Sequence, residues 1–205
     1  MVLIIDFFII LSSYSPSDMN YSEEQLAIIN DNINNIIVNA IPGSGKTTTI
    51  AGICEKYRDK NILTLTYNKR LERESRQRIK GDVYTFHSFA TSKYQTCHND
   101  KMLRDIINIP GSKRSLYHII IIDEVQDMYE LLFKFVIKVI YDWTCPDFRI
   151  IVFGDYKQNI FKSLNNSDHR YLTLCDKIMS KYNNLPWKRY NLTISYRCTP
   201  AVCDF

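Results

Sequence analysis

The residues whose chemistry is easiest to recognise lie between Ala40 and Thr48, where the chain reads Ala-Ile-Pro-Gly-Ser-Gly-Lys-Thr-Thr. An apolar run at 36–38 precedes this glycine-rich stretch, and a segment compatible with a helix follows it. Strand, glycine turn and helix in this order let backbone N–H groups and the positive end of the helix converge on phosphate groups. Lys46 would neutralise phosphate oxygens there, and the Thr47 hydroxyl would bind Mg²⁺. The pattern predicts a nucleoside triphosphate site, in which Ala40 replaces the usual first glycine.

A pair of carboxylates, Asp123 and Glu124, directly follows four consecutive isoleucines at 119–122. Such a run predicts a strand that is buried on both faces of a parallel sheet. Ligand sites in open α/β sheets lie beyond the carboxyl ends of the strands, so the pair would reach the same edge as the phosphate loop. Asp123 could hold Mg²⁺ through water there, and Glu124 could polarise the attacking water during triphosphate hydrolysis. An acidic helix cap is the alternative explanation, and the preceding strand argues against it.

Two further strand ends carry polar residues that suit the terminal phosphate. The strand predicted at 149–153 runs into a loop in which Gln158 could sense the γ-phosphate. The last predicted strand, 190–194, is followed closely by Tyr196 and Arg197. A guanidinium stabilises charge on a transferred phosphoryl group better than an ammonium does, which makes Arg197 a candidate for that role.

A capping box formed by Ser22 and Gln25 predicts a helix from Ser22 to Asn30, just ahead of the phosphate loop. The role of Gln25 in the cap is structural. Its carboxamide also offers both a donor and an acceptor, so it could read the edge of a purine base.

Candidate nucleic-acid contacts follow two other predicted strands, at 61–66 and 82–86. The first strand leads into Tyr67 and Lys69 and then into a charged helix predicted at 71–79. An aromatic ring can stack on a base while neighbouring cations meet phosphates. The alternative is that this charged helix face is simply solvated.

The remaining pattern predicts helices at 128–142 and 168–182, the first with a clear apolar face. Another helix is expected to begin near His87, and residues 91–115 are expected to form helix and loop over the sheet. Strands that alternate with helices predict an α/β fold, with a mostly parallel sheet and helices on both faces.

The composition is that of an ordinary globular protein with one domain in 205 residues. A net charge of +4 permits contact with nucleic acid without requiring it. The six cysteines show no metal-binding spacing, which favours a reduced intracellular setting, cytoplasmic or nuclear. Frequent Ile, Asn, Lys and Tyr residues are typical of an AT-rich genome, such as that of a large DNA virus.

The first residues, Met1 to Leu11, form an apolar run that is too short to span a membrane and lacks the basic start of a signal peptide. Met19 opens a more conventional beginning. We therefore expect residues 1–18 to be an extension upstream of the true start, and residues 19–205 to form the domain. The intact mass of the native protein tests this, and a short strand at the domain edge is the alternative.

Together these motifs resemble those of superfamily 1 DNA helicases of the UvrD/Rep/PcrA type, in the same order along most of the chain. The matching stretches are Glu24-Gln25 (Q motif), Ala40 to Thr48 (Walker A), Thr64 to Lys69 (motif Ia), Thr85 to Ser88 (motif Ib), Asp123 to Asp127 (Walker B), Gly154 to Phe161 (motif III) and Ser195 to Arg197 (motif IV). The segments Thr66 to Lys69 and Thr85 to Ser88 look closest to the F-box DNA helicase branch.

The resemblance implies a RecA-like P-loop NTPase fold and the first motor domain of an ATP-dependent 3′-to-5′ DNA helicase, acting in DNA repair or replication. Its ligands would be ATP and Mg²⁺, and its partner single-stranded DNA. The implied catalytic residues are Lys46, Asp123, Glu124, Gln158 and Arg197. The implied nucleotide contacts are Gln25, Ala40, Gly43, Ser44, Gly45, Lys46, Thr47, Thr48 and Tyr196, with Mg²⁺ on Thr47 and Asp123. The implied DNA contacts are Tyr67, Asn68, Lys69, Thr85 and His87.

Two departures from the family bear on activity. About 35 residues separate Ser88 from Asp123, so we expect the accessory subdomain inserted in several relatives to be absent or reduced. The sequence ends at Phe205, before the second RecA-like domain that closes the ATP cleft in the family. We therefore expect weak ATP binding and poor hydrolysis unless a second domain or chain completes the site. A non-catalytic ATP and single-strand-binding remnant is one alternative, and an RNA helicase is another.

Overall fold

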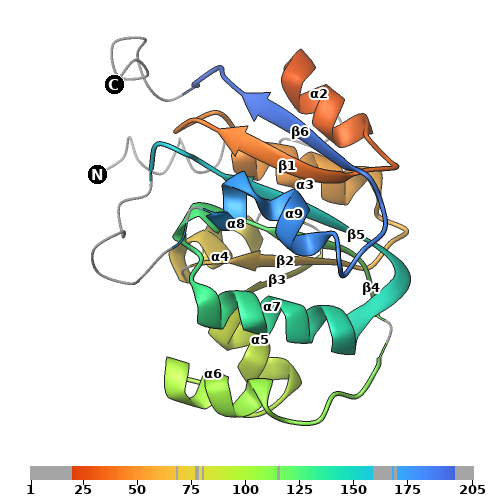
Figure 1. The fold of residues 1–205 in the computed structure, drawn as a ribbon. Helices are drawn as coiled ribbons and strands as arrows, with labels where there is room; N and C mark the ends of the chain where they lie inside the picture. The colour runs from red at the N-terminus through yellow and green to blue at the C-terminus, as the bar shows by residue number, and fades with distance from the viewer. Residues whose placement is uncertain are drawn as a thin grey trace, which may run out of the picture.

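The computed structural model describes residues 20–67, 69–76, 79, 81–114, 116–158, 168 and 170–196. Within these residues the centre is a six-stranded sheet in the order β3-β2-β4-β5-β1-β6, and each strand pairing is parallel (Figure 1). The strands are β1 (Asn35–Ala40), β2 (Ile62–Thr66), β3 (Asp82–Thr85), β4 (Tyr117–Ile122), β5 (Thr144–Gly154) and β6 (Trp187–Leu192). Asn68, Arg197, the end of the predicted motif III and the extension at 1–18 lie outside the described residues.

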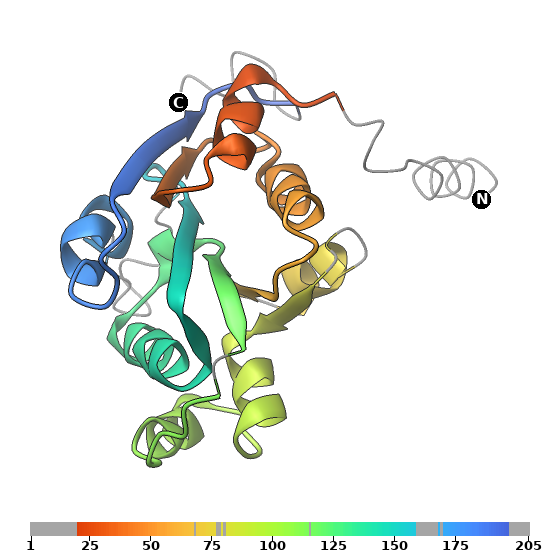
Figure 2. The ribbon, with the colours of Figure 1, turned by 90° about the vertical axis from the view of Figure 1, so that its right-hand side faces the viewer.

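Helices cover both faces of this sheet (Figure 2). They are α2 (Glu23–Asn30), α3 (Lys46–Lys56), α4 (Lys69–Arg76), α5 (Phe86–Lys93), α6 (Asp100–Ile107), the short 3-10 helix η2 (Val125–Asp127), α7 (Glu130–Trp143), α8 (Arg170–Thr173) and α9 (Cys175–Met179). In the described part of the chain, no helix is long and apolar enough to cross a membrane. The predicted α/β fold with a parallel sheet and helices on both faces is confirmed.

The isoleucines of β4 serve two separate apolar cores, because successive strand side chains point to opposite faces. Ile120 and Ile122 pack in the core that lies under α5, α6 and α7. Ile119 and Ile121 pack in the other core, with side chains from α2 and α3. Burial on both faces explains the uninterrupted isoleucine run and confirms the predicted buried strand.

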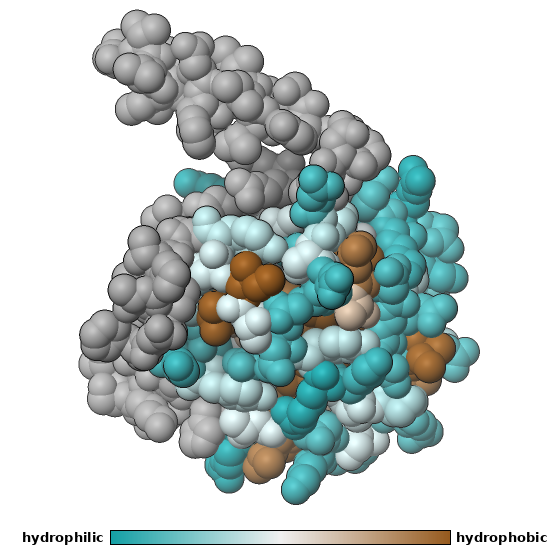
Figure 3. Space-filling view, turned by 90° about the horizontal axis from the view of Figure 1, so that it is seen from above, coloured by the Kyte–Doolittle hydropathy of each residue, from teal (hydrophilic) through white to brown (hydrophobic). Residues whose placement is uncertain are grey.

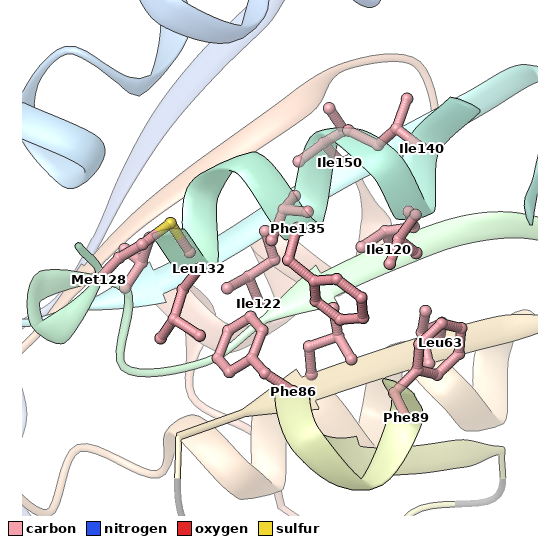
Figure 4. Close-up of a cluster of buried hydrophobic side chains, with 14 of the residues drawn as sticks. Leu63, Phe86, Phe89, Ile120, Ile122, Met128, Leu132, Phe135, Ile140 and Ile150 are labelled. Atoms are coloured by element: carbon pink, nitrogen blue, oxygen red, sulfur yellow. The ribbon is translucent and has the colours of Figure 1, made fainter. Parts of the chain in front are cut away.

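The first of these cores is rich in aromatic rings, and Figure 4 shows part of it, including Phe86 and Phe89 from α5 and Phe135 from α7. Phe89 is fully buried at its centre. Its ring centroid lies 5.6 to 6.3 Å from those of Tyr84, Tyr117, Phe135 and Trp143.

Replacing Phe89 with alanine is expected to lower the free energy of unfolding by about 3–5 kcal/mol, because the surrounding rings cannot collapse into the space. Urea denaturation measures this loss. Leu174→Ala is the control, since Leu174 is 37% exposed; it should cost under about 1 kcal/mol. Equal losses in the two variants would contradict the described core.

The strand order places the candidate chemistry at one edge of the sheet. Because the strands are parallel, their carboxyl ends share that edge. Strand β5 lies between β4 and β1, so the loop after β5 sits between the acidic pair after β4 and the phosphate loop after β1. Strand β6 lies on the other side of β1 and delivers the segment that ends at Tyr196.

The strand predicted at 149–153 is longer in the structure, where β5 begins at Thr144 and ends at Gly154. Two further predicted elements were placed wrongly. The last strand was predicted at 190–194, but β6 pairs with β1 from Trp187 to Leu192. Its side chains Lys188 and Arg189 are exposed, so hydrophobic pattern alone could not reveal the start of this edge strand. The predicted helix at 168–182 is instead the two short helices α8 and α9. The Thr173 carbonyl accepts a hydrogen bond from Arg189 (2.8 Å), which takes this carbonyl out of a continuous helix.

Candidate nucleotide and nucleic-acid site

The phosphate loop has the backbone that its glycines were predicted to allow. Gly43 and Gly45 have φ angles of 72° and 83°, and α3 begins at Lys46. A Cβ on residue 45 would lie 2.6 Å from Nε2 of Gln25, so both the backbone angle and the neighbouring side chain require glycine there. The loop therefore leads directly into a helix N-terminus, where backbone N–H groups are available to phosphates.

Ala40 takes the place of the usual first glycine without strain. It is the last residue of β1, is fully buried and belongs to the core that includes α3. The described residues with positive φ are Gly43, Gly45, Gly81 and Glu124, so Ala40 keeps ordinary strand backbone. A small Cβ is consequently tolerated at this position.

The acidic pair after β4 meets the lysine of the phosphate loop. Glu124 has a φ of 55°, an unfavourable angle for a residue with a Cβ and one that occurs preferentially at functional sites. Its backbone N–H donates to Oδ1 of Asp123 (3.0 Å), and its Oε1 lies 3.5 Å from Nζ of Lys46. Asp123 and Lys46, which are 77 positions apart in sequence, are thus brought into one cluster with Glu124.

Burial raises the pKa of the Asp123 carboxyl well above its usual range, and the negative charge of Glu124 raises it further. Lys46 opposes both effects. Burial also raises the pKa of Asp127, to about 6, again with a contribution from Glu124. The cluster holds more carboxylates than its lysine can neutralise, so it favours the binding of another cation.

Replacing Asp123 with asparagine is expected to stabilise the nucleotide-free chain, by about 1–3 kcal/mol at pH 8. The folded carboxyl, with its raised pKa, keeps its proton to a higher pH than the unfolded one. Its contribution to stability is therefore present below about pH 4 and is lost as the pH rises through the folded pKa. Asparagine does not titrate, so its contribution to stability does not depend on pH. The substitution should therefore raise the free energy of unfolding little at pH 5 and more at pH 8.

Urea denaturation of both proteins at the two pH values measures this difference. Asp105→Asn is the matched control, because Asp105 is exposed on α6. An equal gain in both variants, or a larger gain for Asp123→Asn at pH 5, would contradict the buried carboxylate cluster.

Gln126 joins the acidic pair to the loop after β5, a role that the sequence did not reveal. Its Nε2 donates to Oε2 of Glu124 (2.7 Å), and its Oε1 accepts from the backbone N–H of Asp155 (3.1 Å). Gln126 is 2% exposed. In the sequence, this glutamine stands three residues after Asp123. Its partner Asp155 lies far along the chain, so no local pattern reveals the contact.

Around the phosphate loop and the acidic pair, three buried polar atoms have no hydrogen-bond partner among the described residues. They are Oγ of Ser44, Oδ1 of Asp127 and Oδ2 of Asp155. A buried polar atom without a partner costs about 1–3 kcal/mol, a cost that a ligand bonded to it would offset. Carboxylate and hydroxyl oxygens are the ligands that Mg²⁺ takes in combination with substrate phosphates. The residues present therefore fit Mg²⁺ bound together with a triphosphate.

The loop after β5 is tied to both neighbours. The backbone N–H of Tyr156 donates to Oδ1 of Asn39 on β1 (3.3 Å), and that of Gln158 donates to the Asp155 carbonyl (3.3 Å). Gln158 is half-buried. The structure therefore places Gln158 in the loop between the phosphate loop and the acidic pair.

The segment after β6 contacts the phosphate loop directly. The backbone N–H of Tyr196 donates to the Gly43 carbonyl (2.9 Å), and the Ser195 hydroxyl donates to the Pro42 carbonyl (2.9 Å). The side chain of Tyr196 is 62% exposed. Tyr196 therefore stands beside the phosphate loop with most of its ring accessible.

Gln25 lies against the same loop, but part of its carboxamide is already used. Its Oε1 accepts from the backbone N–H of Ser22 (2.9 Å), which completes the predicted capping box. This bond fixes the orientation of the amide, because an N–H group can only donate. The Nε2 group then faces Gly45, and Gln25 is 3% exposed.

The predicted nucleic-acid residues lie at the other half of the same edge, at the ends of β2 and β3. Tyr67 packs partly against the aromatic core, and Lys69 is exposed at the start of α4. Thr85 is buried, and its Oγ1 accepts from the backbone N–H of Ser88 (3.1 Å) in a capping box for α5. Its hydroxyl therefore has a structural role that the sequence analysis did not assign.

His87 belongs to a hydrogen-bonded group that the sequence did not predict. Its Nε2 lies 3.2 Å from Oδ1 of Asp100, whose Oδ2 accepts from the Tyr129 hydroxyl (2.8 Å). Asp100 opens α6 and Tyr129 precedes α7, so the group depends on how these helices pack. No local sequence pattern could have revealed it.

A broad hollow of about 1560 Å³ runs from Asp100 and Tyr129 along α7 towards Tyr182. None of the phosphate-loop residues lines it, so it is separate from the candidate nucleotide site. Several of its charged side chains pair with one another: Lys134 with Glu130, Lys138 with Asp142, and Arg170 with Asp168. This pairing leaves it without the strong positive charge of a phosphate-binding groove.

A phosphate loop after β1, an acidic pair after β4 and a strand between them define the P-loop NTPase class of α/β proteins. Residues 25–163 match the family model described as an AAA domain. The match covers more than half of the chain, so this chain belongs to that family. No curated protein matches its sequence significantly.

Solved structures of Pif1 helicases share the fold. One, described as showing DNA unwinding at forked dsDNA by two coordinating Pif1 helicases, is 19% identical with a TM-score of 0.53, over 89% of this chain and 46% of that one. Pif1 from Bacteroides sp. with ADP-AlF4 is 20% identical, with a TM-score of 0.53 over 90% of this chain and 44% of that one. Bacteroides Pif1 bound to ssDNA is 20% identical, with a TM-score of 0.54 over 90% and 44%.

At these identities the likeness establishes the fold alone, a parallel α/β fold that this chain shares with part of each Pif1 helicase. The chain spans less than half the length of each of these helicases.

Proposed function

We propose that this chain is the first motor domain of an ATP-dependent DNA helicase and that it binds Mg-ATP at the phosphate loop. The observation that carries the proposal is the convergence of Lys46, Asp123 and Glu124 at one end of the sheet. The unpartnered buried oxygens at the same place support it.

In this proposal, the triphosphate lies on the loop amides and Lys46 exchanges its ion pair with Glu124 for phosphate oxygens. Thr47 and Asp123 would hold Mg²⁺, which neutralises charge on the phosphates. Release from Lys46 leaves Glu124 free to accept a proton from the attacking water, while Gln126 keeps its carboxylate oriented. Gln158 and Arg197 would contact the γ-phosphate, and Gln25 and Tyr196 the base.

The nucleic-acid surface in this proposal is formed by Tyr67, Asn68, Lys69, Thr85 and His87. Support comes from the position of the described members of this set at the ends of β2 and β3, beside the nucleotide half of the edge. An aromatic ring, a cation and an imidazole that follow the ends of two neighbouring strands suit a single strand with unpaired bases. The resemblance to UvrD-type helicases predicts DNA as the substrate and 3′-to-5′ as the direction.

A second RecA-like domain would close the nucleotide cleft, from the same polypeptide or from a partner chain. The support is that the chain aligns with less than half of each Pif1 helicase of the same fold. Turnover by the 205-residue chain is then expected to be slow and to rise when the complementary domain is supplied.

The test is ATP turnover and oligonucleotide binding by the purified chain, with DNA and RNA strands of the same sequence. The proposal predicts ATP turnover that single-stranded DNA increases more than RNA does. Binding of both ligands without turnover would indicate a binding module instead. A preference for RNA would overturn the choice of DNA.

A further inference from the structure

Three segments that are distant in sequence form one hydrogen-bonded unit beside the phosphate loop. The first turn of α2 contributes Glu24, whose two carboxylate oxygens accept from the backbone N–H of Thr193 (2.8 Å) and from its hydroxyl (2.5 Å). The segment after β6 is thereby tied to a helix residue that lies 169 positions earlier in the sequence. Two residues beyond Thr193, the same segment is bonded to Pro42 and then to Gly43.

Hydrogen bonds, rather than apolar burial, hold this segment in place. Ile194 is 51% exposed and Tyr196 is 62% exposed, so neither side chain anchors the backbone in a core. The face towards which α2 and β6 lie carries interspersed polar and apolar side chains (Figure 3). Beyond the buried Leu192, the segment is therefore held by its hydrogen bonds to Glu24, Pro42 and Gly43.

We propose that Glu24 is a positioning residue for the nucleotide base. By holding Thr193 against α2, it keeps Tyr196 at the side of the phosphate loop, where the tyrosine ring meets the base. The proposal rests on the proposed ATP site. It goes beyond that function because it assigns base recognition to a carboxylate that does not touch the nucleotide.

Gln25 is less suited to carry this recognition alone. Its Oε1 is engaged by the backbone N–H of Ser22, so Nε2 is the group that remains on the side of Gly45. A stacked ring adds affinity that does not depend on a free carboxamide acceptor. The contribution of the base to ATP affinity is therefore expected to depend on the position of Tyr196.

The experiment compares Mg-ATP with inorganic tripolyphosphate, which fills the phosphate loop but has no base. Glu24→Ala is expected to weaken ATP binding about 5- to 150-fold, the range that the loss of one aromatic–base contact produces. Tripolyphosphate affinity should change less than about 2-fold, because Lys46 and the loop amides are unaffected. Calorimetric titration of the full chain gives both constants.

Two matched variants separate this role from a general effect on the helix. Glu23→Ala removes the same charge from the same first turn of α2, but Glu23 is exposed, and its ATP affinity should stay near that of the unmodified chain. Glu24→Gln keeps one carbonyl acceptor and should recover part of the lost affinity. Melting temperatures show that each variant is folded under the conditions of the titration.

A double-mutant cycle with Tyr196→Ala gives the decisive comparison. If Glu24 acts through Tyr196, the single variants lose similar affinity for ATP and the double variant loses little more. Additive losses would overturn the proposal, as would an equal weakening of tripolyphosphate or an equal effect of Glu23→Ala. Failure of the unmodified, folded chain to bind ATP would instead remove the proposed function itself.

Discussion

Replacing Lys46 with alanine is expected to reduce the affinity for Mg-ATP by about 30- to 5,000-fold. The ammonium group is the cation nearest the acidic cluster, and in the proposed complex it faces triphosphate oxygens in a partly buried site. Removing one partner of a charge pair that is shielded from water costs about 2–5 kcal/mol, which corresponds to this loss. Equilibrium titration with a fluorescent ATP analogue measures it.

The same substitution should also destabilise the free chain at neutral pH. Lys46 lowers the pKa of both Asp123 and Asp127, so its loss leaves these carboxylates with less compensating charge. Lys56→Ala is the matched control, because Lys56 lies at the other end of α3 and donates to Asn30 away from the acidic cluster. ATP affinity that is unchanged in folded Lys46→Ala would contradict the assignment of the phosphate loop.

Replacing Glu124 with glutamine is expected to lower the rate of ATP turnover by about 100- to 10,000-fold, the range that a general base contributes. The amide cannot accept a proton from water. ATP binding should be retained or strengthened, because Lys46 no longer has a carboxylate to pair with before the nucleotide binds. Turnover with single-stranded DNA present, measured alongside ATP affinity, separates the two effects.

Glu130→Gln is the control for this second prediction, since Glu130 is exposed at the start of α7 and pairs with Lys134. It should leave turnover close to that of the unmodified chain. Turnover that survives in Glu124→Gln would assign the general base to another group. A loss of ATP binding equal to the loss of turnover would show that Glu124 acts in binding.

The nucleotide half of the site was predictable because it depends on short stretches of sequence. Glycines at 43 and 45 predict a loop with positive φ angles, and four consecutive isoleucines predict a strand buried on both faces. These patterns involve residues that are close in sequence, so they can be recognised without knowledge of the fold. They led to the parallel α/β fold and to the relative positions of Lys46, Asp123 and Glu124.

The residues that were missed act through contacts that are distant in sequence. Gln126 reaches Asp155, and Glu24 reaches Thr193, only after the strands have taken their order in the sheet. The edge strand β6 escaped prediction for a related reason, because it is recognised by its pairing with β1 rather than by an apolar pattern. Thr85 was read as a contact residue, although its hydroxyl caps α5.

The broad family was easier to predict than the particular branch. The motif order predicted a superfamily 1 helicase motor domain; the AAA domain match shows the family, and the likeness to Pif1 structures shows the fold. The UvrD type and the F-box branch were inferred from a few residues around Tyr67 and His87. Both remain predictions, as does the direction of movement along DNA.

The most direct test of the whole account is a calorimetric titration of the 205-residue chain with ATP, in the presence and absence of Mg²⁺. We expect one binding site per chain, with an affinity that falls sharply when Mg²⁺ is removed, because Asp123 would then face the phosphates without a cation between them. A folded chain that binds no ATP, or binds it equally well without Mg²⁺, would contradict the proposed role of the phosphate loop and the acidic pair.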